Sequence, residues 1–96
     1  MMDNEILDLR IEIDKIDMDI LSLLNRRAEL VMKIGEFKHA KGIHVRDLNR
    51  EENLIAKLCE CNQGPFSNDQ ISFIWREIIK HCCDLQTGLI EKSKTC

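Results

Sequence analysis

The feature that most constrains this chain is a long stretch without proline, from Asp3 to about Ala40. At a rise of about 1.5 Å per residue, a helix over this stretch is roughly 57 Å long, which exceeds the diameter of a compact domain of 96 residues. Such a helix must protrude or pair with another helix. The prediction of one amphipathic helix comes from apolar residues spaced three and four apart: Ile6, Leu9, Ile13, Ile16, Ile20, Leu23, Leu24, Leu30, Val31, Ile34 and Phe37.

A second helix is predicted after a short connection. Lys41-Gly42 supplies a stop signal for the first helix, and residues 43–46 show no helical face, so we expect a loop there. Either Asp47 or Asn49 is expected to cap the second helix. Asn49 is a candidate because Glu52 follows it at the spacing of a capping box.

The third helix is predicted from a second capping signal. The second helix is expected to run to about Cys61 and to be ended by Gly64-Pro65. Ser67 and Gln70 then have the spacing of a capping box, and the third helix is expected to reach about Gly88. Its apolar face consists of Ile71, Ile74, Trp75, Ile78, Ile79, Cys82 and Leu85.

The predicted fold class is all-α, with one very long helix and two shorter ones. No segment shows the alternation of a β-strand. The two shorter helices are too short to cover the whole apolar stripe of the first helix, so we expect an intertwined helical homodimer. The alternative is a monomeric bundle in which the first helix breaks near Gly35 and folds back. The domain is expected to occupy residues 1–90, with a frayed tail at residues 91–96.

Charge and hydropathy exclude several classes of partner. The net charge of -3 provides no positive field for nucleic acid or for an anionic membrane. No apolar run approaches the roughly 18 residues of a membrane span. The acidic start of the chain, residues 1–5, lacks the basic and apolar segments of a signal peptide, so a cytoplasmic protein is expected.

The cysteines do not predict a metal site. There are five of them, and the Cys59-x-Cys61 and Cys82-Cys83 spacings on predicted helices do not form a zinc framework. In a reducing cytosol, thiols are used as small apolar residues. We therefore expect no metal and no disulfide framework.

Cations on the apolar side of the first helix indicate that the protein binds an anionic ligand. Arg27 occupies the seven-residue series that otherwise holds isoleucine, and Lys38 follows at nearly three whole turns, on almost the same side. Arg10 borders the same stripe but lies roughly 42 Å from Lys38 along the axis, so one helix cannot bring both to one small ligand. An antiparallel partner helix can. The alternative is that the cations reach water along buried stems or pair with a core carboxylate.

Two further groups of polar residues are candidates for a site. Arg46, Asp47, Arg50 and Glu51 gather around the free backbone N–H groups at the start of the second helix. On the third helix, Gln86 lies four residues after Cys82, beside the apolar stripe. The alternative is an ordinary solvated cluster and a glutamine at the edge of the core.

Five segments of the chain have a specific order and spacing, although each is weak alone. They are LRIEIDKID (residues 9–17), LLNRR (23–27), IGEFK (34–38), VRDLNRE (45–51) and IIKHCCDLQ (78–86). Together they resemble the all-helical (AroQ) class of chorismate mutases, and the resemblance covers Ile6 to Leu89. The resemblance implies a homodimeric, cofactor-free enzyme that converts chorismate to prephenate. We expect the chain to hold no fused dehydrogenase, dehydratase or synthase domain.

The resemblance also implies how the substrate is held. Arg27 and the partner subunit's Arg10 would grip its two carboxylates, because forked, charge-assisted bonds suit that task. Arg46 and Arg50 would line the pocket. Cys82 departs from the family pattern, in which serine is frequent at this place near a substrate carboxylate, and a thiol is the weaker donor.

The remaining implied contacts concern the ring hydroxyl and the ether oxygen of the substrate. Glu51 and the backbone near Asp47 would bind the hydroxyl, and Lys38 and Gln86 would donate to the ether oxygen. A Claisen rearrangement is unimolecular, and negative charge grows on that oxygen as the C–O bond breaks. Positioned donors are therefore enough, without a nucleophile, a metal or a cofactor.

Two other functions stay open from the sequence. Isochorismate pyruvate-lyase resembles the same fold and pocket, and release of pyruvate from isochorismate would identify it. A noncatalytic helical dimerisation or regulatory domain is the third interpretation, although retention of so many cations argues against a decayed site. Binding of chorismate without turnover would favour that class.

Overall fold

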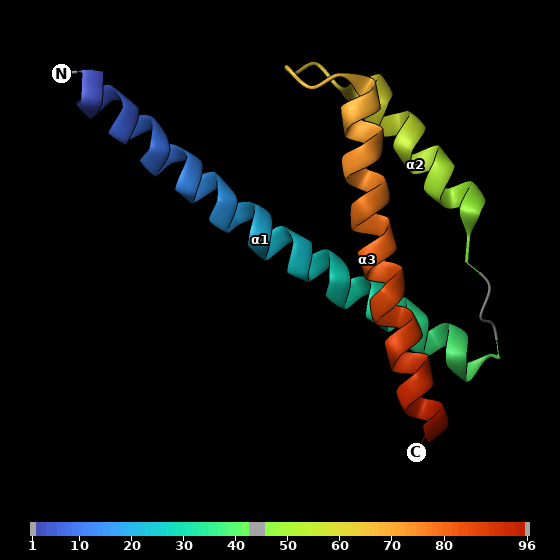
Figure 1. The fold of residues 1–96 in the computed structure, drawn as a ribbon. Coiled ribbons are helices and arrows are strands. Elements are labelled where there is room, and N and C mark those ends of the chain that lie inside the picture. The colour runs from blue at the N-terminus through green and yellow to red at the C-terminus, as the bar shows by residue number, and fades with distance from the viewer. Residues whose placement is uncertain (1, 43–45, 96) are drawn as a thin grey trace. The chain divides into compact units, whose positions relative to one another are not determined.

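The computed structural model describes residues 2–42 and 46–95, and the side chains of residues 3–42 and 46–86. Over these ranges the chain forms three helices, which are α1 (Met2–Ala40), α2 (Leu48–Cys61) and α3 (Asn68–Thr95) (Figure 1). The predicted all-α class with one very long helix is confirmed. Most of the expected loop at 43–46 lies outside the described residues, as does Cys96.

The first helix continues through Gly35 and ends where the sequence predicted. Its last turn holds the basic residues Lys38 and His39, and the positive charge of Lys38 is favoured there by the helix dipole. Beyond it, the Gly42 N–H donates to the carbonyl of His39 at 3.0 Å, and Gly42 has a φ of +73°. A glycine accepts this left-handed conformation without a steric penalty. The alternative in which the helix breaks near Gly35 is therefore wrong.

Asp47 caps the second helix, and Asn49 does not. The Asp47 carboxylate accepts from the backbone N–H of Arg50 at 3.0 Å, which satisfies one of the free donors of the first turn. The expected partner of Asn49, Glu52, instead accepts two bonds from Arg76 of α3, at 2.8 and 3.3 Å. The Arg76 hydrogen bond lowers the pKa of Glu52. An ion pair between helices has replaced the local capping box.

The connection between α2 and α3 is organised by Asn62. This residue ends α2 in an extended conformation, before Gly64-Pro65 is reached. Its amide donates to the carbonyl of Phe66 at 2.7 Å and to Asn68 at 3.0 Å, and its side-chain oxygen accepts from the Gly64 N–H. An asparagine that bonds the following backbone in this way stabilises a turn. Gly64-Pro65 thus lies inside the turn and does not end the helix.

The third helix begins as predicted and ends later. The Ser67 hydroxyl accepts from the Gln70 N–H at 3.1 Å, and the Gln70 side chain accepts from the Ser67 N–H at 2.9 Å, so the capping box is confirmed. The helix passes Gly88 and includes residues 91–95, where a frayed tail was expected. One glycine weakens a helix by only about 1 kcal/mol, and no proline follows to stop it.

The chain divides into two compact units, Met1–Leu30 and Val31–Cys96. In the second unit, α2 and α3 pack side by side as an antiparallel pair (Figure 1). Among the described side chains, the buried apolar ones are Ile55 of α2 with Ile79 and Cys82 of α3. Three side chains make a small core, which leaves much apolar surface uncovered.

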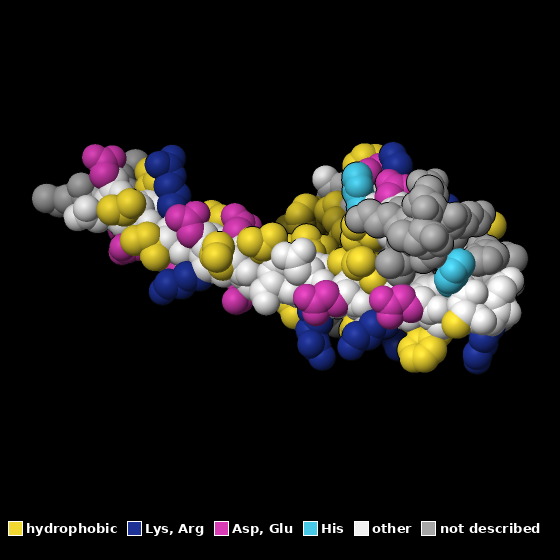
Figure 2. Space-filling view, turned by 90° about the horizontal axis from the view of Figure 1, so that it is seen from below, with side chains coloured by type: hydrophobic (Ala, Val, Ile, Leu, Met, Phe, Trp, Pro, Cys, Tyr) yellow, Lys and Arg dark blue, Asp and Glu magenta, His cyan; other side chains and the backbone are white. Residues whose placement is uncertain are grey.

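The first unit is the N-terminal part of α1, and its apolar stripe is exposed. Leu23 is 66% exposed, and Ile6, Leu9, Ile13, Ile16 and Ile20 are each exposed as well. Figure 2 shows apolar side chains at the surface of this helix, between charged ones. An exposed apolar stripe of this extent is typical of an interaction surface. No described helix has both the length and the apolar character that a membrane span requires.

Candidate active site

The predicted site residues are divided between the two units. Arg10 and Arg27 belong to the first unit, where Arg10 is exposed and Arg27 is half-buried. All the others belong to the second unit: Lys38, Arg46, Asp47, Arg50, Glu51, Cys82 and Gln86. Among the described residues no charged side chain is buried. Arg27 and Lys38, the cations expected on the apolar side of the first helix, are both half-buried.

Gln86 is held against the C-terminal part of α1. Its side-chain Nε2 donates to the backbone carbonyl of Val31 at 2.8 Å, which links α3 to α1. Gly35 lies one turn further along α1 and is buried. A Cβ on Gly35 would lie 3.1 Å from Cγ of Gln86 and 3.6 Å from its Cβ. The glutamine side chain therefore rests on a bare section of helix backbone.

Lys38 shares this face of α1. Residues three and four apart on a helix are neighbours, with roughly 5–6 Å between their Cβ atoms, and Lys38 follows Gly35 by three and Val31 by seven. The half-buried Lys38 thus projects within one turn of the place where Gln86 packs. Two hydrogen-bond donors, one cationic and one neutral, are brought to one face of α1.

At the start of α2, Arg46 and Glu51 form a forked ion pair. Arg46 Nε donates to Glu51 Oε2 at 2.6 Å and Arg46 Nη2 donates to Oε1 at 2.5 Å. The hydrogen bond to Glu51 raises the pKa of Arg46. The Glu51 carboxylate is largely covered, at 16% exposed, but each oxygen keeps a lone pair that can accept from a hydroxyl. Arg50 lies beside this pair, with its backbone N–H bound to Asp47 and its side chain exposed.

The turn of α3 before Gln86 faces this cluster. Cys82 is 7% exposed and is part of the small core. Burial raises the pKa of the adjacent Cys83 thiol, while the positive charge of Arg46 opposes that rise, which places Cys83 within electrostatic range of Arg46. Gln86 follows Cys83 by three residues on the same helix, so the turn of α3 that packs on α1 through Gln86 also carries Cys83.

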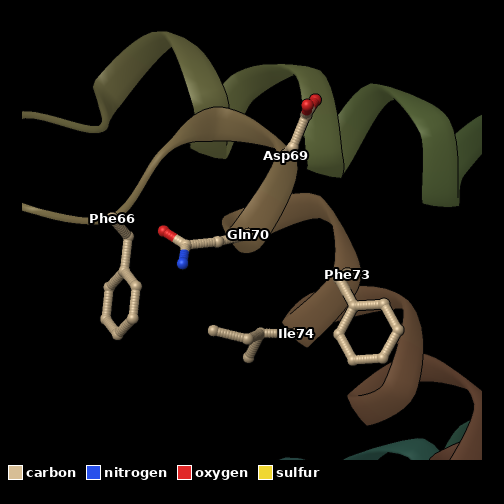
Figure 3. A pocket seen from close by; sticks show the side chains of 5 residues that line it. All are labelled: Phe66, Asp69, Gln70, Phe73 and Ile74. Atoms are coloured by element: carbon tan, nitrogen blue, oxygen red, sulfur yellow. The ribbon is translucent and has the colours of Figure 1, made fainter.

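A separate depression at the start of α3 has the wrong chemistry for a carboxylate ligand. It has a volume of about 380 Å³ and is lined by Phe66, Asp69, Gln70, Phe73 and Ile74. Figure 3 shows the two phenyl rings and Ile74 there, with the Asp69 carboxylate pointing away from them. The Gln70 side chain is already used in the capping box. None of these residues carries a positive charge, and none is a predicted site residue.

Comparison with known proteins identifies the family. The family profile described as chorismate mutase type II matches residues 9–87, which is most of the chain. The chain belongs to the type II chorismate mutases. The resemblance drawn from the five sequence segments is thereby confirmed.

Solved structures of chorismate mutase share this fold. Form II of the chorismate mutase from Thermus thermophilus superimposes with a TM-score of 0.84 at 37% sequence identity, covering 86% of this chain and 94% of that one. The chorismate mutase of Methanocaldococcus jannaschii is 31% identical over 97% of this chain and 95% of its own length. Both are similar to this chain over nearly their whole length.

Other relatives are much longer. The bifunctional chorismate mutase/prephenate dehydratase of Aquifex aeolicus is 38% identical over 85% of this chain, and the one of Neisseria gonorrhoeae is 30% identical over 92%. The chain spans about a quarter of the length of these relatives, 24% in each case. Their names join a mutase and a dehydratase, and the profile match of this chain is to the mutase.

Sequence reasoning missed two features of the site. It treated Gly35 as a weak point of the helix, whereas the structure places it under Gln86. It treated Arg46 and Glu51 as separate contacts, whereas they are paired with each other. A mid-helix glycine on the same face as Lys38 was the available signal for the first. For the second, residues five apart across a helix start give no clear periodic signal.

Proposed function

We propose that this chain is a chorismate mutase, like the relatives that carry this name, and that it catalyses the Claisen rearrangement of chorismate to prephenate. The observation that carries the proposal is the placement of Gln86 on the face of α1 that bears Lys38. Two donors aimed at one region are what a developing negative charge on the ether oxygen requires. Other residues of the site can then serve binding alone.

In the proposed mechanism, Lys38 and Gln86 donate hydrogen bonds to the ether oxygen. These bonds strengthen as the C–O bond breaks, so they stabilise the transition state more than the bound substrate. Val31 takes one of the two N–H donors of the Gln86 amide, and the second remains for the substrate. The reaction is unimolecular, and the proposed mechanism uses no cofactor and no metal.

The two carboxylates of chorismate are held by Arg27 and by the partner subunit's Arg10 in a homodimer. The spacing of Arg10 and Lys38 along one helix is too great for a single small ligand, so a second chain must supply one of them. The exposed apolar stripe of α1 supports pairing of long helices, because such a surface is stable when it is covered. Fixing both carboxylates holds the side chain over the ring before reaction.

The start of α2 binds the rest of the substrate. Glu51, oriented by Arg46, accepts a hydrogen bond from the ring hydroxyl. The backbone at Asp47 binds the same hydroxyl, and Arg50 lines the pocket. Cys82 lies near a carboxylate of the substrate as a weak donor. We further propose a cytoplasmic enzyme. The described cysteines, namely Cys59, Cys61, Cys82 and Cys83, form no disulfide with one another, which suits a reducing compartment.

The test is loss of chorismate absorbance with purified protein, followed by acid conversion of the product to phenylpyruvate. Lys38→Ala is expected to lower kcat by at least about 100-fold, the usual cost of losing one donor to a developing oxyanion. Lys33→Ala is the matched control, since Lys33 is exposed on α1 and lies two residues from Gly35, on another face. Its activity should stay within about twofold of the unaltered protein.

Two results would count against the proposal. Folded protein that leaves chorismate unchanged would contradict the mutase activity, and release of pyruvate from isochorismate would replace it with the lyase reaction. Full activity of Lys38→Ala would leave the reaction in place but remove Lys38 from it.

A further inference from the structure

Gly35 has no role in the proposed chemistry, yet it occupies a demanding place. It is buried in the C-terminal part of α1, inside the helix, where a glycine is less favourable for helix formation than an alanine. Its φ is not in the left-handed region, so backbone conformation does not require glycine here. What distinguishes the position is its neighbour, the side chain of Gln86.

The Gln86 amide and the Gly35 backbone meet at one carbonyl. In an α-helix the carbonyl of Val31 accepts from the N–H of Gly35, and it also accepts from Gln86 Nε2 at 2.8 Å. A carbonyl can only accept, so this bond fixes which end of the amide faces α1. The side chain therefore lies directly over the turn in which Gly35 lacks a Cβ.

We propose that Gly35 is a positioning residue for Gln86. By lacking a Cβ, it sets how deeply the Gln86 side chain seats on α1 and therefore where the second N–H of the amide points. The inference rests on the proposed function, in which that N–H donates to the ether oxygen. Gly35 touches no reacting atom in this account and acts only through Gln86.

An alanine at this position would displace Gln86 without unfolding the helix. A Cβ 3.1 Å from Gln86 Cγ is tighter than ordinary van der Waals contact, so the glutamine must move by a few tenths of an ångström. The bond to Val31 would then lengthen or tilt. Misplacement of about 1 Å can cost about 100-fold in rate, so this smaller shift should lower kcat by about tenfold. KM should stay within about twofold, because the affected bond strengthens only in the transition state.

The experiment compares Gly35→Ala in two backgrounds, with Gly64→Ala as the control. Gly64 lies in the turn before α3, where a Cβ would meet only Asn62 Oδ1 at 3.9 Å, so its substitution should leave kcat unchanged. Gly35→Ala should lower kcat about tenfold while the unfolding midpoint stays the same or rises, since alanine favours the helix. In the Gln86→Ala background, the same change should alter kcat less than twofold.

The outcomes separate positioning from a general packing role. A kcat that falls equally in both backgrounds would overturn the inference, because Gly35 would then act without Gln86. An unchanged kcat in the intact background would overturn it as well. If the unaltered protein does not turn over chorismate, the proposed function fails, and the position of Gln86 is judged by its side-chain amide resonances in a ¹⁵N NMR spectrum. They should move in Gly35→Ala and stay in Gly64→Ala, and unmoved resonances in Gly35→Ala would refute the contact.

Discussion

At the scale of single residues, the proposed site relies on Gln86, a side chain that carries no charge. Its amide can donate at any pH near neutrality, and its bond to Val31 fixes its orientation. A neutral donor also avoids the cost of placing a second charge beside Lys38. Cys82 is buried in the small core of the second unit, where a thiol packs as a small apolar side chain.

Replacing Gln86 by glutamate should make activity depend on pH. The carboxyl group of Gln86→Glu can donate to the ether oxygen only when it is protonated, so kcat should be substantial near about pH 5 and should fall as the pH rises toward about 8. The ionised form would also repel the carbonyl of Val31, which it faces. The measurement is kcat across this pH range.

Gln70→Glu is the matched control for that experiment. Gln70 lies in the capping box of α3, where a glutamate can take the same role. Its pH profile should follow that of the unaltered protein. Equal activity of Gln86→Glu at both ends of the range would remove Gln86 as the donor.

At the scale of secondary structure, the ends of the helices follow local chemistry. The side chains of Asp47 and Ser67 accept from backbone N–H groups in the first turns of α2 and α3. Gly42 adopts a left-handed conformation just after the end of α1. These features are visible in the sequence because donor and acceptor are at most a few residues apart. The ion pair between Glu52 and Arg76 is different, because its partners are brought together by packing of α2 on α3.

Gly42 permits a test of backbone strain alone. A Cβ at this position would meet nothing within 4 Å, so the φ of +73° is the reason for glycine. Gly42→Ala should lower the free energy of unfolding by about 1 kcal/mol, measured by urea denaturation. Gly42→Asn should cost less, since asparagine tolerates this conformation better. Equal stability of Gly42→Ala and the unaltered protein would contradict the assignment of strain.

At the scale of the whole molecule, the exposed stripe of α1 and the small core of the second unit both favour association. A chain whose described core consists of three apolar side chains, while many large ones are exposed, has much to gain from covering them. In the proposed homodimer, the same contact that covers the stripe also completes the site. Stability and activity should then both depend on protein concentration.

Mixing two inactive variants should restore activity if the site is shared between chains. Each site of the proposed dimer takes Arg27 and Lys38 from one chain and Arg10 from the other. A heterodimer of Arg10→Ala and Lys38→Ala chains therefore has one intact site and one doubly altered site. Random pairing after joint refolding should give about a quarter of the activity of the unaltered protein.

The control for complementation uses two residues from the same half of the site. Arg27→Ala mixed with Lys38→Ala leaves both sites of the heterodimer damaged, so no recovery is expected. Recovery in this control, or none with Arg10→Ala and Lys38→Ala, would contradict a site built from two chains.

The three helices, most of their ends and the family could be predicted from the sequence alone. Periodicity and capping act within a few residues, so residues 3–40 and the Ser67–Gln70 box could be predicted directly. The set of candidate site residues also came from the sequence, through the resemblance of their order and spacing.

How those residues meet depends on the packing of the helices against one another. Gln86 and Val31 are 55 residues apart, and their hydrogen bond exists because α3 packs against the C-terminal part of α1. The same packing places the Gln86 side chain against Gly35, a residue that helix propensity alone had marked as a weak point of α1. The pairing of Glu52 with Arg76 of α3 is another contact between distant segments, 24 residues apart. Contacts between distant segments depend on the packed shape of the chain, which no short pattern in the sequence encodes.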